Sequence, residues 1–230
     1  MHDETTLEME ILGAPTVRLV NNAGWAGRLE PLLRSRLKLL GRAEGSDGVS
    51  LLTRRLRLAR PSTYYHCLRA ARISRRIGRA FGFDDARLRQ LSATAMMHDV
   101  GKLLVPESIL SRPRRPTRLE QFILHLHPSF GALLASYFRL SAELRVRTQH
   151  HHERWDGRGY PHKLGGTDIP LMARIVQVAD TYDAMVADDR TYRRPLNDAD
   201  AVRELRAHSG KQFDPRVVEA FLDTFPEGRR

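Results

Sequence analysis

From residue 61 to its end, the chain presents one helix signal after another. Ser62 or Thr63 can cap a first helix that runs to about Phe81, and Gly82 can end it. Apolar residues recur at helical spacing in the segments that follow, and no segment alternates at a period of two residues long enough to require a strand. We therefore predict an all-α fold, built as a helical bundle.

Capping residues locate the starts of the later helices. Helices are expected to open at Asp84-Asp85, behind the capping box Thr117-x-x-Glu120, ahead of Gln149, at Pro170, at Asp198 and at Asp214-Pro215. The capping box precedes the apolar stretch QFILHLHPSFGALLASYF, which we expect to be helical.

Residues 1–60 carry fewer helix signals, because glycine and proline interrupt them repeatedly. Within them, RLEPLLRSRLKLL at residues 28–40 predicts a short basic helix that starts at about Pro31. We predict two parts: an N-terminal arm or small helical segment over residues 1–60, and a main domain over residues 61–230. The arm packs on the main domain or, in the alternative interpretation, forms a homodimer contact.

The composition indicates a folded protein of a reducing compartment. Hydrophobic residues make up 41% of the chain and charged residues 28%, which favours a packed core over disorder. Cys67 is the only cysteine, so an internal disulfide is excluded. We find no apolar run of the roughly 18 residues that a membrane helix needs, and the first residues carry acids where a secretion signal carries bases. We expect a soluble cytoplasmic protein.

The net charge is +11, and the basic excess lies in the middle of the chain. A phosphate-bearing partner would suit this charge. Arginine supplies most of the basic residues, however, which an arginine-biased genome also explains. Aromatic residues amount to 7% and show no pattern for stacking bases, so a nucleic-acid-binding protein is the less favoured interpretation.

Histidine and aspartate recur in separate groups along the helical part of the chain. The candidates for metal binding are His66, His98, Asp99, His127, His151, His152 and Asp180. Imidazole and carboxylate ligands together suit iron, manganese or zinc. They are too many for one ion and about right for two ions that share a carboxylate. Burying so many titratable groups without a metal would cost on the order of several kcal/mol each.

The adjacent pair His98 and Asp99 restricts the geometry of such a centre. Neighbouring residues on a helix point roughly 100° apart. The pair can therefore serve one ion only at a helix end, unless Asp99 bridges to a second ion. Gly101 follows and would let the backbone turn there.

Two sequence segments carry a family resemblance. MMHDVGK together with HHERWDGRGYP resembles the HD-GYP family, a branch of the HD superfamily of metal-dependent phosphohydrolases. The pattern HHExWDGxGYP matches without a gap over residues 151–161, and the resemblance extends from about Ser62 to about Phe225. KLLVPESIL, His127-Pro128, ADTYDAM and QFDP follow in the family's order.

The resemblance implies a helical bundle around a metal centre, commonly of iron or manganese, that hydrolyses cyclic di-GMP. It assigns as metal ligands the same histidines and aspartates named above. Some relatives hold a third metal through a carboxylate one turn before the first histidine, where this chain has Ser62. The resemblance therefore implies two metal ions with Asp99 between them.

The resemblance also implies roles for residues around the metals. Lys102 would hold the phosphate as a point charge, and Arg190 and Arg193 would grip it from the opposite side. Their segment AMVADDRTYRR is one residue longer than is usual in the family. Tyr160 would contact substrate or wall the pocket, and Asp183 would orient a ligand or Lys102. The alternative for Lys102, Asp183 and the two arginines is an ordinary solvated surface.

Other residues are expected to stand outside the centre. Glu153 and Trp155 are interpreted as supports of the Gly-Tyr-Pro loop, and Cys67 as a core residue. Five histidines lack a matching motif or point to another helix face, and we leave them out: His2, His125, His150, His162 and His208.

The sequence thus predicts a metal-dependent phosphodiesterase that converts cyclic di-GMP to pGpG or GMP in bacterial signal transduction. Another cyclic dinucleotide is an alternative substrate. A further alternative is a catalytically silent adaptor that docks signalling partners, such as diguanylate cyclase proteins, through Gly159-Tyr160-Pro161. No membrane partner is expected.

Overall fold

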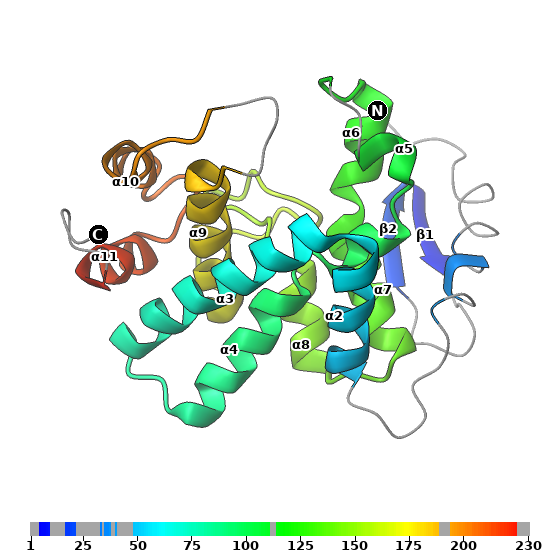
Figure 1. Cartoon of the computed structure of the whole chain (residues 1–230), viewed down its shortest axis with the longest axis horizontal. Coiled ribbons are helices and arrows are strands. Elements are labelled where there is room, and N and C mark those ends of the chain that lie inside the picture. The colour runs from blue at the N-terminus through cyan, green and yellow to red at the C-terminus, as the bar shows by residue number, and fades with distance from the viewer. Residues whose placement is uncertain are drawn as a thin grey trace.

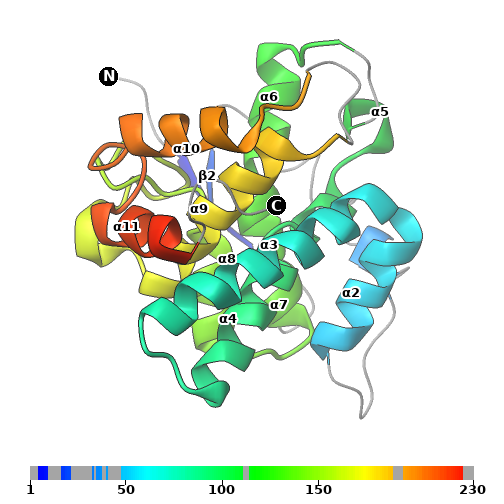
Figure 2. The same ribbon diagram turned by 60° about the vertical axis from the view of Figure 1, so that its left-hand side comes forward.

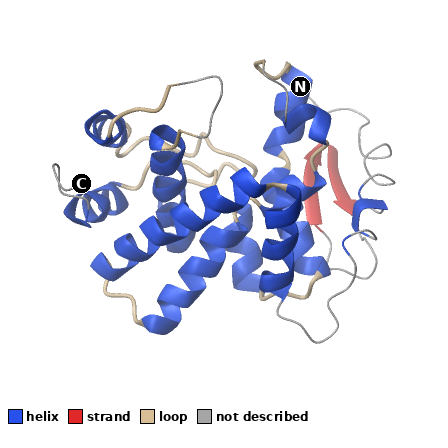
Figure 3. Cartoon of the chain, in the orientation of Figure 1, coloured by secondary structure: helices blue, strands red, loops and turns tan. Residues whose placement is uncertain are grey.

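The computed structural model describes residues 5–9, 17–21, 33, 35–37, 40, 48–110, 114–188 and 194–224. Helices dominate this part of the chain (Figure 3), which confirms the all-α class. Two short strands, β1 (Thr5–Met9) and β2 (Val17–Asn21), add an antiparallel pair in which Thr5 lies opposite Asn21. This pair was not predicted.

The helices follow one another along the chain, most of them through short connections, although residues 150–170 separate two of them (Figure 1). They are α2 (Gly48–Ala59), α3 (Pro61–Ala80), α4 (Asp85–Met97), α5 (Glu107–Leu110), α6 (Arg118–His125), α7 (His127–Tyr137), α8 (Ala142–Gln149), α9 (Leu171–Val186), α10 (Asp198–Ala207) and α11 (Pro215–Thr224), with 3₁₀ turns η1 (Val100–Leu104) and η2 (Gly166–Asp168).

Most predicted starts are confirmed by the capping contacts. The Asp84 side chain accepts a hydrogen bond from the Arg87 amide, and Thr117 and Glu120 form the reciprocal capping box. The prediction for α3 was wrong by one or two residues, because the helix begins at Pro61 with no side-chain cap. Proline suits the first helical position, since the missing N–H would have no partner there.

The cap of α10 also differs from the prediction by one residue. Asn197, rather than Asp198, accepts the hydrogen bond from the amide of Asp200. Asp198 is instead the first residue of the helix, where its negative charge favours the helix N-terminus.

The apolar stretch behind the capping box is two helices rather than one. Leu126 ends α6, and α7 begins at His127 with Pro128 in its first turn. Proline cannot continue the hydrogen bonding of a helix that approaches from its N-terminal side. The break places His127 at the start of a new helix, so the axis of α6 does not determine where its side chain points.

Helix α2 was not predicted, and it belongs to the packed body of the molecule. It lies against α3 and η1, and Leu52 and Leu56 on it are fully buried. Of the basic helix expected over residues 28–40, the described positions 33, 35–37 and 40 are helical, and Leu33 and Leu37 are buried beside Leu52. The division of the chain at residue 60 stays a prediction.

The apolar side chains form two clusters. One is built from α3, α4, α9, α10 and α11, and the other from α2, η1, α6, α7 and α8 with residues 33 and 37. Figures 1 and 2 show α10 and α11 beside α9, on the side of the molecule away from α2. Helix α4 contributes Ala95 to the first cluster and Met97 to the second, so its end lies where the two meet.

Gly101 fixes how closely η1 approaches α7. A Cβ atom at this position would lie 1.9 Å from the carbonyl oxygen of His127 and 2.5 Å from the amide nitrogen of Gly131. We expected Gly101 to permit a turn of the backbone. The structure shows a different role, because only glycine allows the two backbones to come this close. This contact places Asp99 and Lys102 beside the start of α7.

We expect Gly101→Ala to lower the free energy of unfolding by on the order of 3 kcal/mol, because backbone atoms must move to admit the methyl group. Gly165→Ala is the matched control, since a Cβ there would meet its nearest atoms at 3.4 Å, an ordinary contact. Denaturant unfolding of both variants measures the difference. Equal free energies of unfolding for the two variants would show that η1 and α7 can move apart without loss of stability.

Candidate metal centre

The structure brings together all of the histidines and aspartates that the sequence singled out as ligands. They come from α3, the end of α4, the start of α7, the residues after α8, and α9. Their ligand atoms form two groups, within each of which all atoms lie within 4.8 Å of one another: His66, His98 and Asp180 in the first group, and His127, His151 and His152 in the second. The first lies among elements of one apolar cluster and the second among elements of the other.

The first group centres on the Asp180 carboxylate. Its Oδ1 lies 2.9 Å from Nε2 of His66 and 3.8 Å from Nε2 of His98. The second group centres on two imidazoles, since Nε2 of His127 and Nε2 of His151 are 3.2 Å apart. The ring of His152 completes it, at a centroid distance of 4.1 Å from His151.

Asp99 lies between the two groups and is 2% exposed. Its Oδ1 is 3.3 Å from Nε2 of His127 in the second group, and its Oδ2 is 3.6 Å from Nε2 of His98 in the first. The two oxygens of one carboxylate therefore face different groups. The backbone explains this position, because α4 ends at Met97 and His98 and Asp99 follow directly. The pair therefore stands at a helix end, which is one of the two arrangements that the sequence allowed.

Three of the histidines are oriented by the same hydrogen bond. Each donates from Nδ1 to the carbonyl three residues earlier, at 2.7 Å in every case: His98 to Ala95, His127 to Leu124 and His151 to Thr148. Carbonyls at the end of a helix lack helical partners and are open to such donors. Because a carbonyl only accepts, the proton of the neutral ring is on Nδ1, and Nε2 presents its lone pair to the centre.

This donor set fits metal cations. Within the described part of the chain, Nε2 of His98 is buried and has no hydrogen-bond partner. The Nε2 atoms of His127 and His151 face each other at 3.2 Å, although both protons are held at Nδ1. Buried lone pairs in this arrangement repel each other, and a cation between them removes the repulsion.

The histidines of the two groups differ in the direction of their pKa shifts. Burial lowers the pKa of His127 and of His152 to about 3, so the second group is neutral. Burial alone would also lower the pKa of His66, but hydrogen bonds to Asp180 and Asp183 raise it to about 10. The first group therefore holds positive charge at neutral pH, and a metal ion binding there would displace protons.

Asp183 holds His66 in place. Nδ1 of His66 donates to Oδ2 of Asp183 at 2.7 Å, and Arg69 donates to both oxygens of the same carboxylate at 2.8 and 3.0 Å. Of the two roles expected for Asp183, the structure favours orienting a ligand. Sequence reasoning missed Arg69, although its position three residues after His66 places it on the same helix face.

Lys102 pairs with Asp99. Its Nζ donates to Oδ2 of Asp99 at 2.6 Å, and 28% of its side chain is exposed. Burial alone would lower the pKa of Lys102, but the Asp99 carboxylate raises it. The lysine is therefore a cation at the edge of the centre.

Comparisons with known proteins agree with this geometry. The model of the HD domain family matches residues 29–217. The chain belongs to the HD domain family. Among curated proteins it is 38% identical to a cyclic di-GMP phosphodiesterase of Thermotoga maritima, over 70% of this chain and 44% of the relative. It is 35% identical to a 3'3'-cGAMP-specific phosphodiesterase of Vibrio cholerae, over 70% of this chain and 31% of the relative.

A solved structure supports the fold. An HDGYP protein from Bdellovibrio bacteriovorus matches 98% of this chain and 95% of its own, with a TM-score of 0.58 at 13% identity. The family match and the curated relatives confirm the resemblance that the sequence carries. The chain spans less than half the length of the curated relatives named above. In the described residues, we find no helix with the length and apolarity to cross a membrane.

The Gly-Tyr-Pro loop of the HD domain covers one side of the centre. The Tyr160 ring stacks on His125 at a centroid distance of 4.3 Å and lies 4.9 Å from the ring of His152. His125 was expected to point away from the site. It belongs to neither ligand group, but its position at the end of α6 brings its ring against Tyr160.

Glu153 anchors this loop, as the sequence predicted. Its carboxylate accepts hydrogen bonds from the amides of His162 and Leu164 at 2.6 and 3.1 Å. The loop also pairs with the QFDP segment, since the amide of Trp155 donates to the carbonyl of Gln212 at 3.1 Å. Tyr160 is therefore held from both ends of its loop.

The predictions for Cys67 and for the two arginines remain to be compared with the structure. Cys67 is fully buried, as expected of a core residue, but its sulfur also lies within 4.8 Å of ligand atoms of His98 and Asp99. Its place directly after His66 is the sequence signal that could have located it. Arg190 and Arg193 lie outside the described residues.

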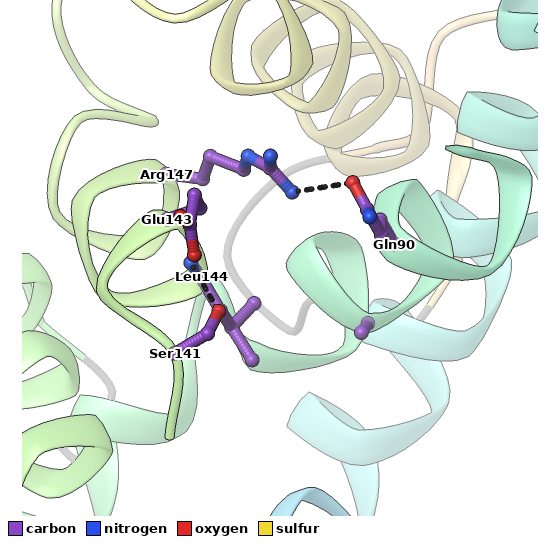
Figure 4. Close-up of a pocket in the computed structure, with 6 residues that line it drawn as sticks. Gln90, Ser141, Glu143, Leu144 and Arg147 are labelled. Atoms are coloured by element: carbon purple, nitrogen blue, oxygen red, sulfur yellow. Dashed lines mark hydrogen bonds between the residues drawn. The ribbon is translucent and has the colours of Figure 1, made fainter. Parts of the chain in front are cut away.

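One pocket on the surface is separate from the centre. Figure 4 shows a pocket between α4 and α8, where Arg147 donates to the Gln90 side chain at 3.2 Å. Its other labelled residues, Ser141, Glu143 and Leu144, come from the start of α8. The metal-ligand candidates do not line it, so it has no part in the chemistry of the centre.

We expect Glu153→Ala to speed hydrogen exchange at the amides of His162 and Leu164, because each loses a charged acceptor worth roughly 1.5–3 kcal/mol. Glu219→Ala is the control, since Glu219 is exposed on α11. Exchange measured by mass spectrometry resolves the loop. Unchanged protection at residues 162–164 would show that Gln212 and its neighbours hold the loop alone.

Proposed function

We propose that this HD domain is a metal-dependent phosphodiesterase that hydrolyses cyclic di-GMP to pGpG or GMP in bacterial second-messenger signalling. The observation that carries the proposal is the position of Asp99, with one oxygen toward each of two three-residue ligand groups. The names of the relatives, which act on cyclic dinucleotides, support the substrate class. The proposed site of action is the cytoplasm.

The proposed cofactor is a pair of iron or manganese ions. His66, His98 and Asp180 would hold one ion, His127, His151 and His152 the other, and Asp99 would be shared. Ser62, at the position of a third-metal ligand in some relatives, is exposed in this structure. A hydroxyl is a poor ligand for these metals, which supports two ions rather than three.

When bound, the metal pair would supply a Lewis acid for the phosphate and a water with a lowered pKa. The chain contributes the remaining charge and shape. Lys102, held by Asp99, places a cation where the non-bridging phosphate oxygens gain negative charge during attack. Tyr160, stacked on His125, lies beside the second group and would form one wall of the substrate site.

Asp183 and Arg69 would act through His66. A carboxylate that accepts from Nδ1 fixes the ring and makes Nε2 a stronger ligand. We propose Arg190 and Arg193 as further phosphate contacts, on the resemblance alone.

Another cyclic dinucleotide is the second candidate substrate, and one observation favours it. The relative from Vibrio cholerae is named for 3'3'-cGAMP, which differs from cyclic di-GMP in one base. The metal centre would face a phosphate in either molecule, so the same ligand set suits both. We also propose a docking role for Gly159-Tyr160-Pro161 toward diguanylate cyclase proteins and a homodimer contact by the N-terminal arm.

The proposal is tested by combining nucleotide turnover with metal analysis. With manganese, we expect about two ions per chain and hydrolysis of cyclic di-GMP. Asp99→Ala should abolish turnover and lower the metal content, because both ions lose a ligand. His208→Ala, an exposed histidine of α10's end, should match the parent chain. Full turnover in Asp99→Ala, or a metal-loaded chain that binds the dinucleotide without cleaving it, would contradict the proposal.

Lys102→Ala separates phosphate contact from support of the metals. We expect both ions to remain bound, because the other ligands are unchanged. Loss of a contact that tightens in the transition state costs about 2–4 kcal/mol, so turnover should fall by roughly 30- to 1000-fold. Turnover and bound manganese are measured together. Loss of metal would reassign Lys102 to holding Asp99, and unchanged turnover would make it a solvated lysine.

A further inference from the structure

The two histidines that flank the HHExWDGxGYP pattern meet in the folded chain. His150 directly precedes the pattern, and His162 directly follows it. Nε2 of His150 lies 3.1 Å from Nδ1 of His162, and their rings are at a centroid distance of 5.1 Å. The segment over residues 150–162 therefore closes on itself, and its two ends present imidazole nitrogens to each other.

Glu153 completes this arrangement with a carboxylate. Its ligand atom and those of the two histidines all lie within 4.8 Å of one another. The turn that places it there is tight, because the amide of Glu153 donates to the carbonyl of His150 at 3.1 Å. The amides that bind its two oxygens hold the carboxylate rigidly. A carboxylate has about four acceptor positions, so these bonds leave room for another partner.

The group is distinct from the metal centre. Its members belong to neither of the two ligand groups described above, and the pocket of Figure 4 does not include them. His151 directs its ring into the centre, whereas His150, one residue earlier, meets the loop at His162. His162 is exposed, so the group is open to solvent.

We propose that His150, Glu153 and His162 form a second metal site, selective for zinc or a similar nitrogen-preferring divalent ion. Two imidazoles and one carboxylate, with a fourth position open to water, are a common zinc ligand set. Two nitrogens bound tetrahedrally at 2.0–2.1 Å lie about 3.3 Å apart, close to the 3.1 Å observed. Manganese prefers oxygen-rich sites and should leave it empty.

A bound ion would connect the end of α8 to the segment after Pro161. It would thereby close the loop that carries Tyr160, in addition to the hydrogen bonds of Glu153. The site shares no ligand with the proposed phosphodiesterase centre, since its ligands are His150 at the end of α8 and Glu153 and His162 in the loop.

The test compares zinc bound by the purified chain and by two single variants at saturating zinc. We expect His162→Ala to bind about one zinc ion fewer per chain than the parent. His208→Ala, which removes an exposed histidine elsewhere, should bind as much as the parent. His162 is exposed, so its removal leaves the fold intact, and circular dichroism checks this.

Asp99→Ala separates the two sites. In that background zinc at the centre is reduced, yet adding His162→Ala should still remove about one further ion. Zinc should also slow hydrogen exchange across residues 154–164 in Asp99→Ala, and not in the double variant. Equal zinc content with and without His162, in either background, would overturn the proposal and leave a hydrogen bond between two imidazoles.

Discussion

The hydrogen bond from a histidine Nδ1 to a helix-end carbonyl orients three of the metal-ligand candidates, and the rest of the centre is arranged around them. His98, His127 and His151 each make it at 2.7 Å. The bond requires a helix to end within three residues of the histidine, because carbonyls inside a helix are already paired. The ends of α4, α6 and α8 are therefore part of the centre, and the same bond that satisfies a helix end aims Nε2 at the metal position.

The bundle must bring these helix ends together, and two local features do so. Pro128 breaks the long apolar stretch so that His127 follows a helix end, and Gly101 lets η1 contact the α7 backbone directly. Asp99 then stands between ligand groups that belong to different apolar clusters. The charge of Asp99 is buried there, and its desolvation is offset by Lys102 and the surrounding histidines.

The sequence could predict the helices and the ligand set because both depend on local signals and on residue type. Asp84 and the Thr117-Glu120 box mark helix starts by their own hydrogen bonds. His125 and Arg69 could not be placed in this way, because their contacts depend on a helix break and on a partner 114 residues away. The strands β1 and β2 were missed for a related reason, since each needs the other to be recognised as a strand.

The segment before the bundle contacts the same turn that carries Lys102. Arg36 donates to the carbonyls of Leu103 and Val105 at 3.2 and 3.1 Å, and Arg60 donates to Val105 at 3.3 Å. These carbonyls close η1, so the cations favour the end of that turn as they favour any helix C-terminus. The position of Asp99 and Lys102 thus depends on residues on both sides of the predicted division at residue 60.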